Sequence, residues 1–149
     1  MAAILLVAHA PLAASLLAVA RHVYPESAVS LAAADIGAGA RPAEAEAQIR
    51  AALDGLGAAE VLILADVFGA SPCRAALAVA DGARARVVAG VNVPMLWRAL
   101  CYAHLPLDDL VTRAVDGGLQ GVLQIGVPRP QNQGPAPASD DQIQHHDQQ

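Results

Sequence analysis

The sequence of 149 residues contains no lysine, so its nine positively charged side chains are all arginines, and they are scattered along the chain. Fourteen acidic residues bring the formal net charge to -5 at pH 7. Domains that bind nucleic acids usually carry a basic stripe or patch. The charge pattern therefore argues against a nucleic-acid partner.

Aromatic residues and cysteines are also few. Aromatics make up 3% of the chain although hydrophobic residues make up 55%, and alanine supplies much of that share, so the core depends on close backbone packing. Cys73 and Cys101 form no CxxC pair and indicate no secreted disulfide framework, so we expect buried thiols. The sequence holds no P-loop, Gly-x-Gly-x-x-Gly or zinc motif, and we expect no nucleotide or metal cofactor.

The sequence also has no uninterrupted apolar stretch as long as a transmembrane helix. Residues 2–20 are apolar, but His9 and Pro11 interrupt them and no positively charged segment precedes them. This pattern does not fit a signal peptide. We expect a cytoplasmic protein.

What the sequence does contain is a regular alternation of strand and helix patterns. An apolar run at residues 4–8 ends at His9, and Pro11 then opens a helical pattern that lasts to about residue 23. Further strands are predicted at 29–34, 61–65, 85–89 and 122–127, and further helices at 42–56, 72–80, 94–104 and 107–116. Residues 35–39 are predicted to be a loop, and Gly117-Gly118 the end of the last helix. This alternation predicts an α/β domain with a mainly parallel open sheet and helices on both faces.

The composition changes at Pro128, after which Gln, Asn, Pro, Asp and His dominate. Such a segment buries too little apolar surface to offset its ordering entropy. We therefore predict one domain over residues 1–127 and a disordered polar tail over 128–149. His145-His146 is predicted to be a solvated part of this tail and not a metal site.

Three predicted strands end in polar residues, His9, Asp66 and Asn92, at what should be one edge of the sheet. A carboxylate beside His9 would orient one ring nitrogen and leave the other as a nucleophile or base. The turn at residues 69–72 leads into a helix, whose free N–H groups and the Ser71 hydroxyl would form an anion site of phosphate size. Pro11 would place a second helix N-terminus beside His9. Together these features predict phosphoryl transfer to and from histidine.

Each of these features also has a simpler explanation. A single histidine at a strand end is more often a structural residue than a catalyst. Residues 69–72 also fit an ordinary helix N-terminus capped by Ser71, and Asn92 also fits a residue that stabilises a turn. The coincidence of all three at one sheet edge favours the functional interpretation.

Three segments carry a resemblance to a known family: Val-Ala-His-Ala-Pro-Leu-Ala at 7–13, Asp-Val-Phe-Gly-Ala-Ser-Pro at 66–72 and Val-Ala-Gly-Val-Asn-Val-Pro-Met-Leu at 88–96. They resemble the mannose-family EIIA domain of the bacterial phosphotransferase system, over residues 1 to about 127. The resemblance implies a homodimeric domain with an antiparallel C-terminal strand exchanged between subunits. It implies that His9 accepts a phosphoryl group from phospho-HPr and passes it to an EIIB-type protein. Asp66 would orient His9, and the phosphate would be bound by Ala10, Gly69, Ala70 and Ser71.

The sequence departs from the family pattern at three positions. Ala10 stands where glycine is common after the histidine, Ala70 replaces the second glycine of Gly-Gly-Ser-Pro, and Arg74 stands where a small polar residue is common. No EIIB-like segment follows, so we expect a separate acceptor protein or a regulatory phospho-switch. Two alternatives are the phosphocarrier subunit of a dihydroxyacetone kinase system and a non-catalytic ligand-binding or interaction domain.

Overall fold

The structure is a computed structural model and describes residues 1–130. The greater part of the predicted tail, with His145 and His146, therefore lies outside the described residues. Strands and helices alternate in the order β1 (Ala3–His9), α1 (Leu12–Val23), β2 (Leu31–Ile36), α2 (Pro42–Leu56), β3 (Val61–Ala65), α3 (Ser71–Val79), β4 (Ala85–Ala89), α4 (Val93–Tyr102) and α5 (Leu107–Gln120).

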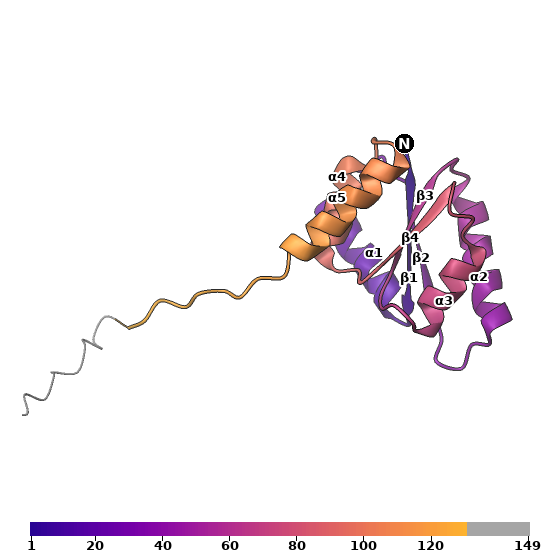
Figure 1. The fold of residues 1–149 in the computed structure, drawn as a ribbon, viewed down its shortest axis with the longest axis horizontal. Helices are drawn as coiled ribbons and strands as arrows, with labels where there is room; N and C mark the ends of the chain where they lie inside the picture. Colours follow the sequence, from indigo (N-terminus) through magenta and orange to yellow (C-terminus); the bar gives the residue numbers. More distant parts are fainter. Residues whose placement is uncertain (131–149) are drawn as a thin grey trace, which may run out of the picture.

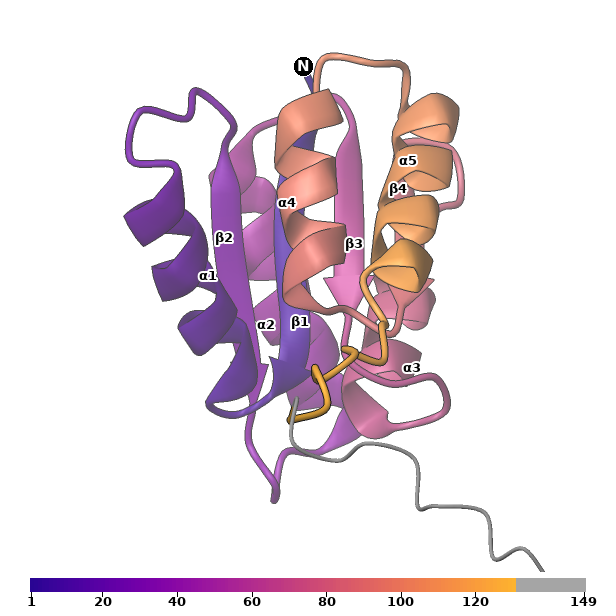
Figure 2. The same cartoon turned by 90° about the vertical axis from the view of Figure 1, so that its left-hand side faces the viewer.

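The four strands form one parallel sheet in the order β2-β1-β3-β4 (Figure 2). In the register, Val7 of β1 lies opposite Ala65 of β3, and Ala65 lies opposite Ala89 of β4. The carboxyl ends of these strands therefore meet at one edge of the sheet. The predicted parallel α/β architecture is confirmed.

Helices cover both faces of the sheet, with α1, α4 and α5 on one face and α2 and α3 on the other (Figure 1). Successive residues of β1 point to opposite faces, so Ile4 and Leu6 pack toward the first layer while Leu5 and Val7 pack toward the second. All four are fully buried, and each contributes about 1.5–3 kcal/mol to folding. This burial on both faces explains why β1 is apolar along almost its whole length.

Helix α5 does not end at Gly117-Gly118 as predicted but continues to Gln120. A Cβ atom at Gly117 would lie 2.6 Å from Cβ of Arg98, and one at Gly118 would lie 2.6 Å from Cε of Met95. The two glycines therefore permit the close approach of α5 to α4. The prediction was wrong because a helix-packing requirement produced the same sequence pattern as a helix terminus.

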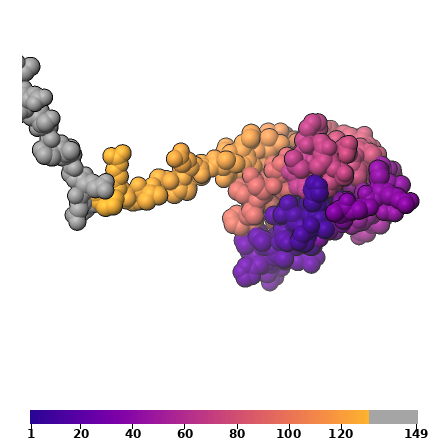
Figure 3. All heavy atoms as spheres, turned by 90° about the horizontal axis from the view of Figure 1, so that it is seen from below, coloured from indigo at the N-terminus to yellow at the C-terminus, as the bar shows by residue number. Residues whose placement is uncertain are grey.

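The ends of two predicted strands also differ from the structure. β2 extends through Asp35 and Ile36, which were predicted to lie in a loop, because they pair with Ala8 and His9 of β1. Residues 122–127 form no strand in this chain: Val122 is 77% exposed and Val127 is 84% exposed. Figure 3 shows this segment, in orange and yellow, leading away from the body of the domain. Its exchange with a second chain stays a prediction.

Candidate functional site

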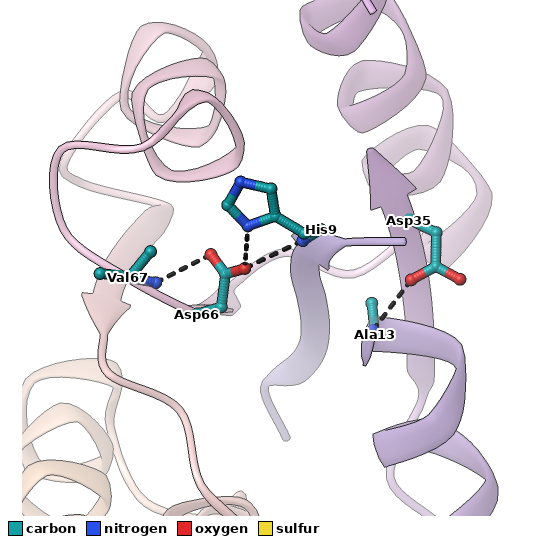
Figure 4. Close-up of polar contacts among 5 residues, drawn as sticks. All are labelled: His9, Ala13, Asp35, Asp66 and Val67. Carbon is teal, nitrogen blue, oxygen red and sulfur yellow. Dashed lines mark hydrogen bonds and ion pairs between the residues drawn. The ribbon is translucent and has the colours of Figure 1, made fainter. Parts of the chain in front are cut away.

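His9 and Asp66 lie side by side at the carboxyl edge of the sheet (Figure 4). His9 is the last residue of β1, and Asp66 follows β3 directly. The backbone N–H of His9 donates to Oδ2 of Asp66 at 2.9 Å, and Nδ1 of the His9 ring lies 2.5 Å from the same oxygen. The adjacent central strands thus place a carboxylate directly against an imidazole.

The second oxygen of Asp66 is also engaged, because Oδ1 accepts a hydrogen bond from the backbone N–H of Val67 at 2.8 Å. Burial by itself raises the pKa of this carboxyl group, whose side chain is 10% exposed. The hydrogen bonds from the His9 backbone, the His9 ring and Val67 outweigh burial and hold the pKa of Asp66 below its ordinary value. Asp66 is therefore ionised at neutral pH and acts only as an acceptor.

An ionised Asp66 determines the tautomer of His9. Because the carboxylate can only accept, the ring proton belongs on Nδ1, and Nε2 of the neutral ring keeps its lone pair. The His9 side chain is 54% exposed, and Figure 4 shows its second nitrogen directed away from Asp66. The ring therefore presents a nucleophile or base to an approaching molecule.

The loop at residues 67–70 leads from Asp66 into α3. Gly69 has φ 87°, a left-handed conformation that favours glycine, whereas Ala70 has φ −82° and ψ 166°, which any residue adopts. The family's second glycine is thus replaced at a position where alanine causes no strain. Ala70 is the N-cap and Ser71 is the first residue of α3, so the simpler explanation of Ser71 as the cap is wrong.

The first turn of α3 offers donors at this edge. The first N–H groups of a helix have no partners within the helix, and they carry the positive end of its dipole. Ser71 and Arg74 also line a hollow of about 280 Å³ between α2 and α3, together with Glu46. An anion near the start of α3 would therefore meet backbone donors and a hydroxyl group.

The second helix N-terminus that the sequence predicted for an anion is already occupied. The N–H groups of Ala13 and Ala14, in the first turn of α1, donate to Oδ1 of Asp35 at 2.9 and 3.2 Å. The N–H of Ala10 donates to the carbonyl oxygen of Ile36 at 3.0 Å. Ala10 thus borders His9 without a free backbone donor.

Asn92 follows β4 at the same edge, but its side chain serves the packing of helices. Its Oδ1 accepts the N–H of Met95 at 2.9 Å and so caps α4, and its Nδ2 donates to the carbonyl oxygen of Gly118 in α5 at 3.1 Å. The role of the Asn92 side chain is therefore structural, as the simpler explanation held, but it caps a helix and does not stabilise a turn.

Asp35 is the residue that the sequence prediction missed at this edge. It was placed in a loop, yet the sequence carried a usable signal: residues 31–34 are apolar and end in an aspartate, as residues 61–65 end before Asp66. Two aspartates at strand ends on either side of β1 would have suggested two carboxylates flanking His9.

A parallel α/β sheet that holds a histidine against a carboxylate at its carboxyl edge defines a domain suited to chemistry at one ring nitrogen. The family model EIIA-man, described as the PTS system fructose IIA component, matches residues 3–115. The chain belongs to this EIIA family of the phosphotransferase system.

Known relatives agree with this assignment. The mannose-specific EIIAB component of Escherichia coli strain K12 is 39% identical over 82 residues, which cover 53% of this chain and 25% of that protein. The chain thus matches about a quarter of the length of this curated relative. The mannose/sorbose-specific IIA subunit from Enterococcus faecalis has 27% identity and a TM-score of 0.78, with 87% of this chain and 98% of that chain covered.

A second solved structure shows the same fold. The EIIA component from Streptococcus agalactiae has 20% identity and a TM-score of 0.74, with 83% of this chain and 97% of that chain covered. Within residues 1–130, no helix combines the length and the apolar character needed to cross a membrane.

Proposed function

We propose that this chain carries a phosphoryl group on Nε2 of His9, between phospho-HPr and an EIIB-type acceptor. Family membership implies phosphoryl transfer in the sugar phosphotransferase system. The observation that supports His9 as the carrier is its contact with Asp66, which engages Nδ1 and leaves Nε2 as the second nitrogen of a side chain that is 54% exposed.

In the proposed step, the Nε2 lone pair of His9 attacks the phosphorus of phospho-HPr. A P–N bond forms on His9 as the bond between phosphorus and its donor atom on HPr breaks, and the bonding electrons return to HPr. The proton on Nδ1 stays on the ring, and the Asp66 carboxylate stabilises the positive charge that develops there. Transfer to the EIIB-type acceptor is the same exchange with a new nucleophile.

The phosphoryl oxygens would lie toward Gly69, Ala70 and Ser71, where the start of α3 supplies N–H donors and a hydroxyl group. Ala10 would border the phosphoryl group through its position beside His9. The protein's contribution is then positioning and electrostatic stabilisation, which are the main sources of catalysis in phosphoryl transfer.

The remaining expectations belong to the same proposal. The domain occupies residues 1–127, works in the cytoplasm and forms a homodimer through residues 122–127, whose large apolar side chains are exposed in the single chain. Its acceptor is a separate EIIB-type protein, or its phosphorylation state is read by a regulatory partner. Recovery of EIIB and sugar-permease components in a pull-down would contradict a purely regulatory role.

The experiment that tests the carrier role is phosphorylation of the chain with enzyme I, HPr and phosphoenolpyruvate. We expect an acid-labile, base-stable adduct in the wild type and in the control His22→Ala, which alters an exposed histidine in the last turn of α1. We expect no adduct in His9→Ala, because the variant lacks the nucleophile. Labelling that persists in His9→Ala would refute the site, and an unlabelled wild type would favour a non-catalytic binding domain.

A further inference from the structure

A second carboxylate, Asp35, lies across β1 from Asp66 and touches the other end of the turn that carries His9. β1 is flanked by β2 and β3, and Asp35 of β2 lies opposite Ala8 in the register. Oδ1 of Asp35 accepts the N–H group of Ala13 at the start of α1 (Figure 4). The same oxygen also accepts the N–H group of Ala14. The two aspartates thus bind the chain immediately before and immediately after the turn.

Helix α1 has no N-terminal cap of its own. Its N-cap position is Pro11, which has no side-chain acceptor, and its first turn contains no acidic residue. Asp35 supplies both the acceptor and the negative charge from a neighbouring strand. The position of α1 relative to the sheet edge therefore depends on this side chain.

The turn itself is short, so its three attachments determine where the imidazole lies. Asp66 holds the backbone N–H of His9, the N–H of Ala10 bonds to Ile36, and Asp35 holds the N–H groups that follow Pro11. Asp35 is in turn fixed by α2, because its carbonyl oxygen accepts a hydrogen bond from Nε2 of Gln48 at 2.8 Å.

The hydrogen bonds of Asp35 also affect whether a phosphoryl group is bound beside α1 or beside α3. Because Asp35 takes the N–H groups of Ala13 and Ala14 and adds a negative charge there, α1 offers a poor site for phosphoryl oxygens. The donors of α3, on the Asp66 side, are then the favoured ones. Asp35 would direct the phosphoryl group toward the loop at residues 67–70.

We propose that Asp35 is a positioning residue for His9: its hydrogen bonds to the start of α1 fix the His9 turn so that Nδ1 meets Asp66 and Nε2 faces the start of α3. The reaction part of this inference rests on the carrier function proposed above. The positional part concerns the imidazole alone and is measurable without any phosphoryl donor.

The test compares single-turnover phosphorylation by phospho-HPr in the full chain and in three variants. Asp35→Ala removes the acceptor and should slow transfer by about tenfold or more, because a misplacement of roughly 1 Å costs on the order of 10²-fold. Asp35→Asn keeps an acceptor oxygen and should slow transfer by only about threefold. The matched control is Asp81→Ala, which removes a carboxylate that accepts the N–H groups of Ala83, Arg84 and Ala85 at the start of β4.

Asp81→Ala should lower the unfolding midpoint while its folded molecules transfer at the wild-type rate. Equal slowing in Asp35→Ala and Asp81→Ala would overturn the proposal, and so would an unchanged rate in Asp35→Ala. If Asp35→Asn slowed transfer as much as Asp35→Ala, the explanation that Asp35 acts through its hydrogen bonds to α1 would be refuted.

Should Asp35→Ala fail to fold, Ala14→Pro removes one of the two donors from an exposed position in the first helical turn, where proline is tolerated. It should slow transfer measurably, and an unchanged rate would contradict the proposal.

Nitrogen-15 shifts of the His9 ring separate this inference from the carrier function. The wild type should show one tautomer with the proton on Nδ1, and the ring in Asp35→Ala should show a mixture. If the wild type shows the single tautomer and Asp35→Ala a mixture, but the wild type accepts no phosphoryl group, the carrier function fails and the positioning role stands. If the tautomer of Asp35→Ala is unchanged, the positioning role fails whatever the transfer assay shows.

Discussion

Asp66 and Asp81 lie at opposite ends of the sheet. Both carboxylates accept hydrogen bonds from backbone N–H groups, but they differ in their side-chain contacts. Each accepts backbone N–H groups at the end of a strand or in the turn before one, and in each case hydrogen bonds lower the pKa of the carboxyl group. At Asp81 all three donors belong to the backbone, so the carboxylate only fixes a turn. At Asp66 one contact is the ring of His9. The contact with the His9 side chain is what makes chemistry possible at the carboxyl edge of the sheet.

Among variants that test this difference between the two aspartates, Asp66→Asn should have the largest effect, on the rate of phosphorylation. An amide can donate to Nδ1, which would place the ring proton on Nε2 and remove the nucleophilic lone pair. We expect a folded protein whose single-turnover phosphorylation is slower on the order of 10²-fold or more. Asp81→Asn serves as the matched control and should transfer at the wild-type rate. An unchanged rate in Asp66→Asn would remove Asp66 from the mechanism.

A smaller effect, on stability alone, is expected from Gly117→Ala in α5. The new Cβ would meet Cβ and Cγ of Arg98 at 2.6 and 2.9 Å, so α4 and α5 must separate. We expect the free energy of unfolding to fall by about 1–3 kcal/mol, measured by denaturant titration.

Gly118→Ala is the control for that experiment. It meets mainly the flexible end of Met95 and should cost less stability than Gly117→Ala. Folded molecules of both variants should accept the phosphoryl group as the wild type does. A Gly117→Ala protein as stable as the wild type would show that the helices can move apart without cost.

The smallest expected effect is on stability at acid pH, to which Asp66 and Asp81 should both contribute. The folded-state pKa values of Asp66 and Asp81 are lowered, so each carboxylate stabilises the fold above the ordinary aspartate pKa of about 4. This contribution is lost as the pH falls through the lowered folded-state values, because the unfolded chain binds these protons first. Unfolding measured from pH 6 to pH 2 should show a weaker pH dependence in Asp66→Asn and in Asp81→Asn. If the stability of both variants depended on pH as strongly as that of the wild type, this explanation would be contradicted.

The central features of the fold were predictable because local sequence determines them. Apolar runs at residues 4–8 and 61–65 are typical of strands buried on both faces, and Pro42 and Gly57 mark the ends of a helix. Gly57 adopts φ 59° at the C-cap of α2, as a helix-terminating glycine should.

The errors arose where tertiary contacts decide the outcome. Gly117 and Gly118 match the pattern of a helix end, because nothing in the local sequence reveals that α4 packs against them. Residues 122–127 form no strand in the single chain, because a strand also needs an edge with which to pair, and their pairing with a second chain stays a prediction. The apolar run at residues 31–34 indicates that Asp35 ends a strand, but its partners were not predictable, because the N–H groups of Ala13 and Ala14 are backbone donors that any sequence supplies. His9 and Asp66 were predictable as neighbours because each comes directly after an apolar run that is typical of a buried strand.

The binding of Nδ1 by Asp66 has a kinetic consequence for the proposed carrier. With one ring nitrogen engaged, donor and acceptor proteins must use the same Nε2 atom, and they must do so in turn. The exchange then follows a double-displacement scheme, in which excess unphosphorylated HPr competes with the acceptor for the free edge of the ring. In such a scheme one partner must leave before the next can bind.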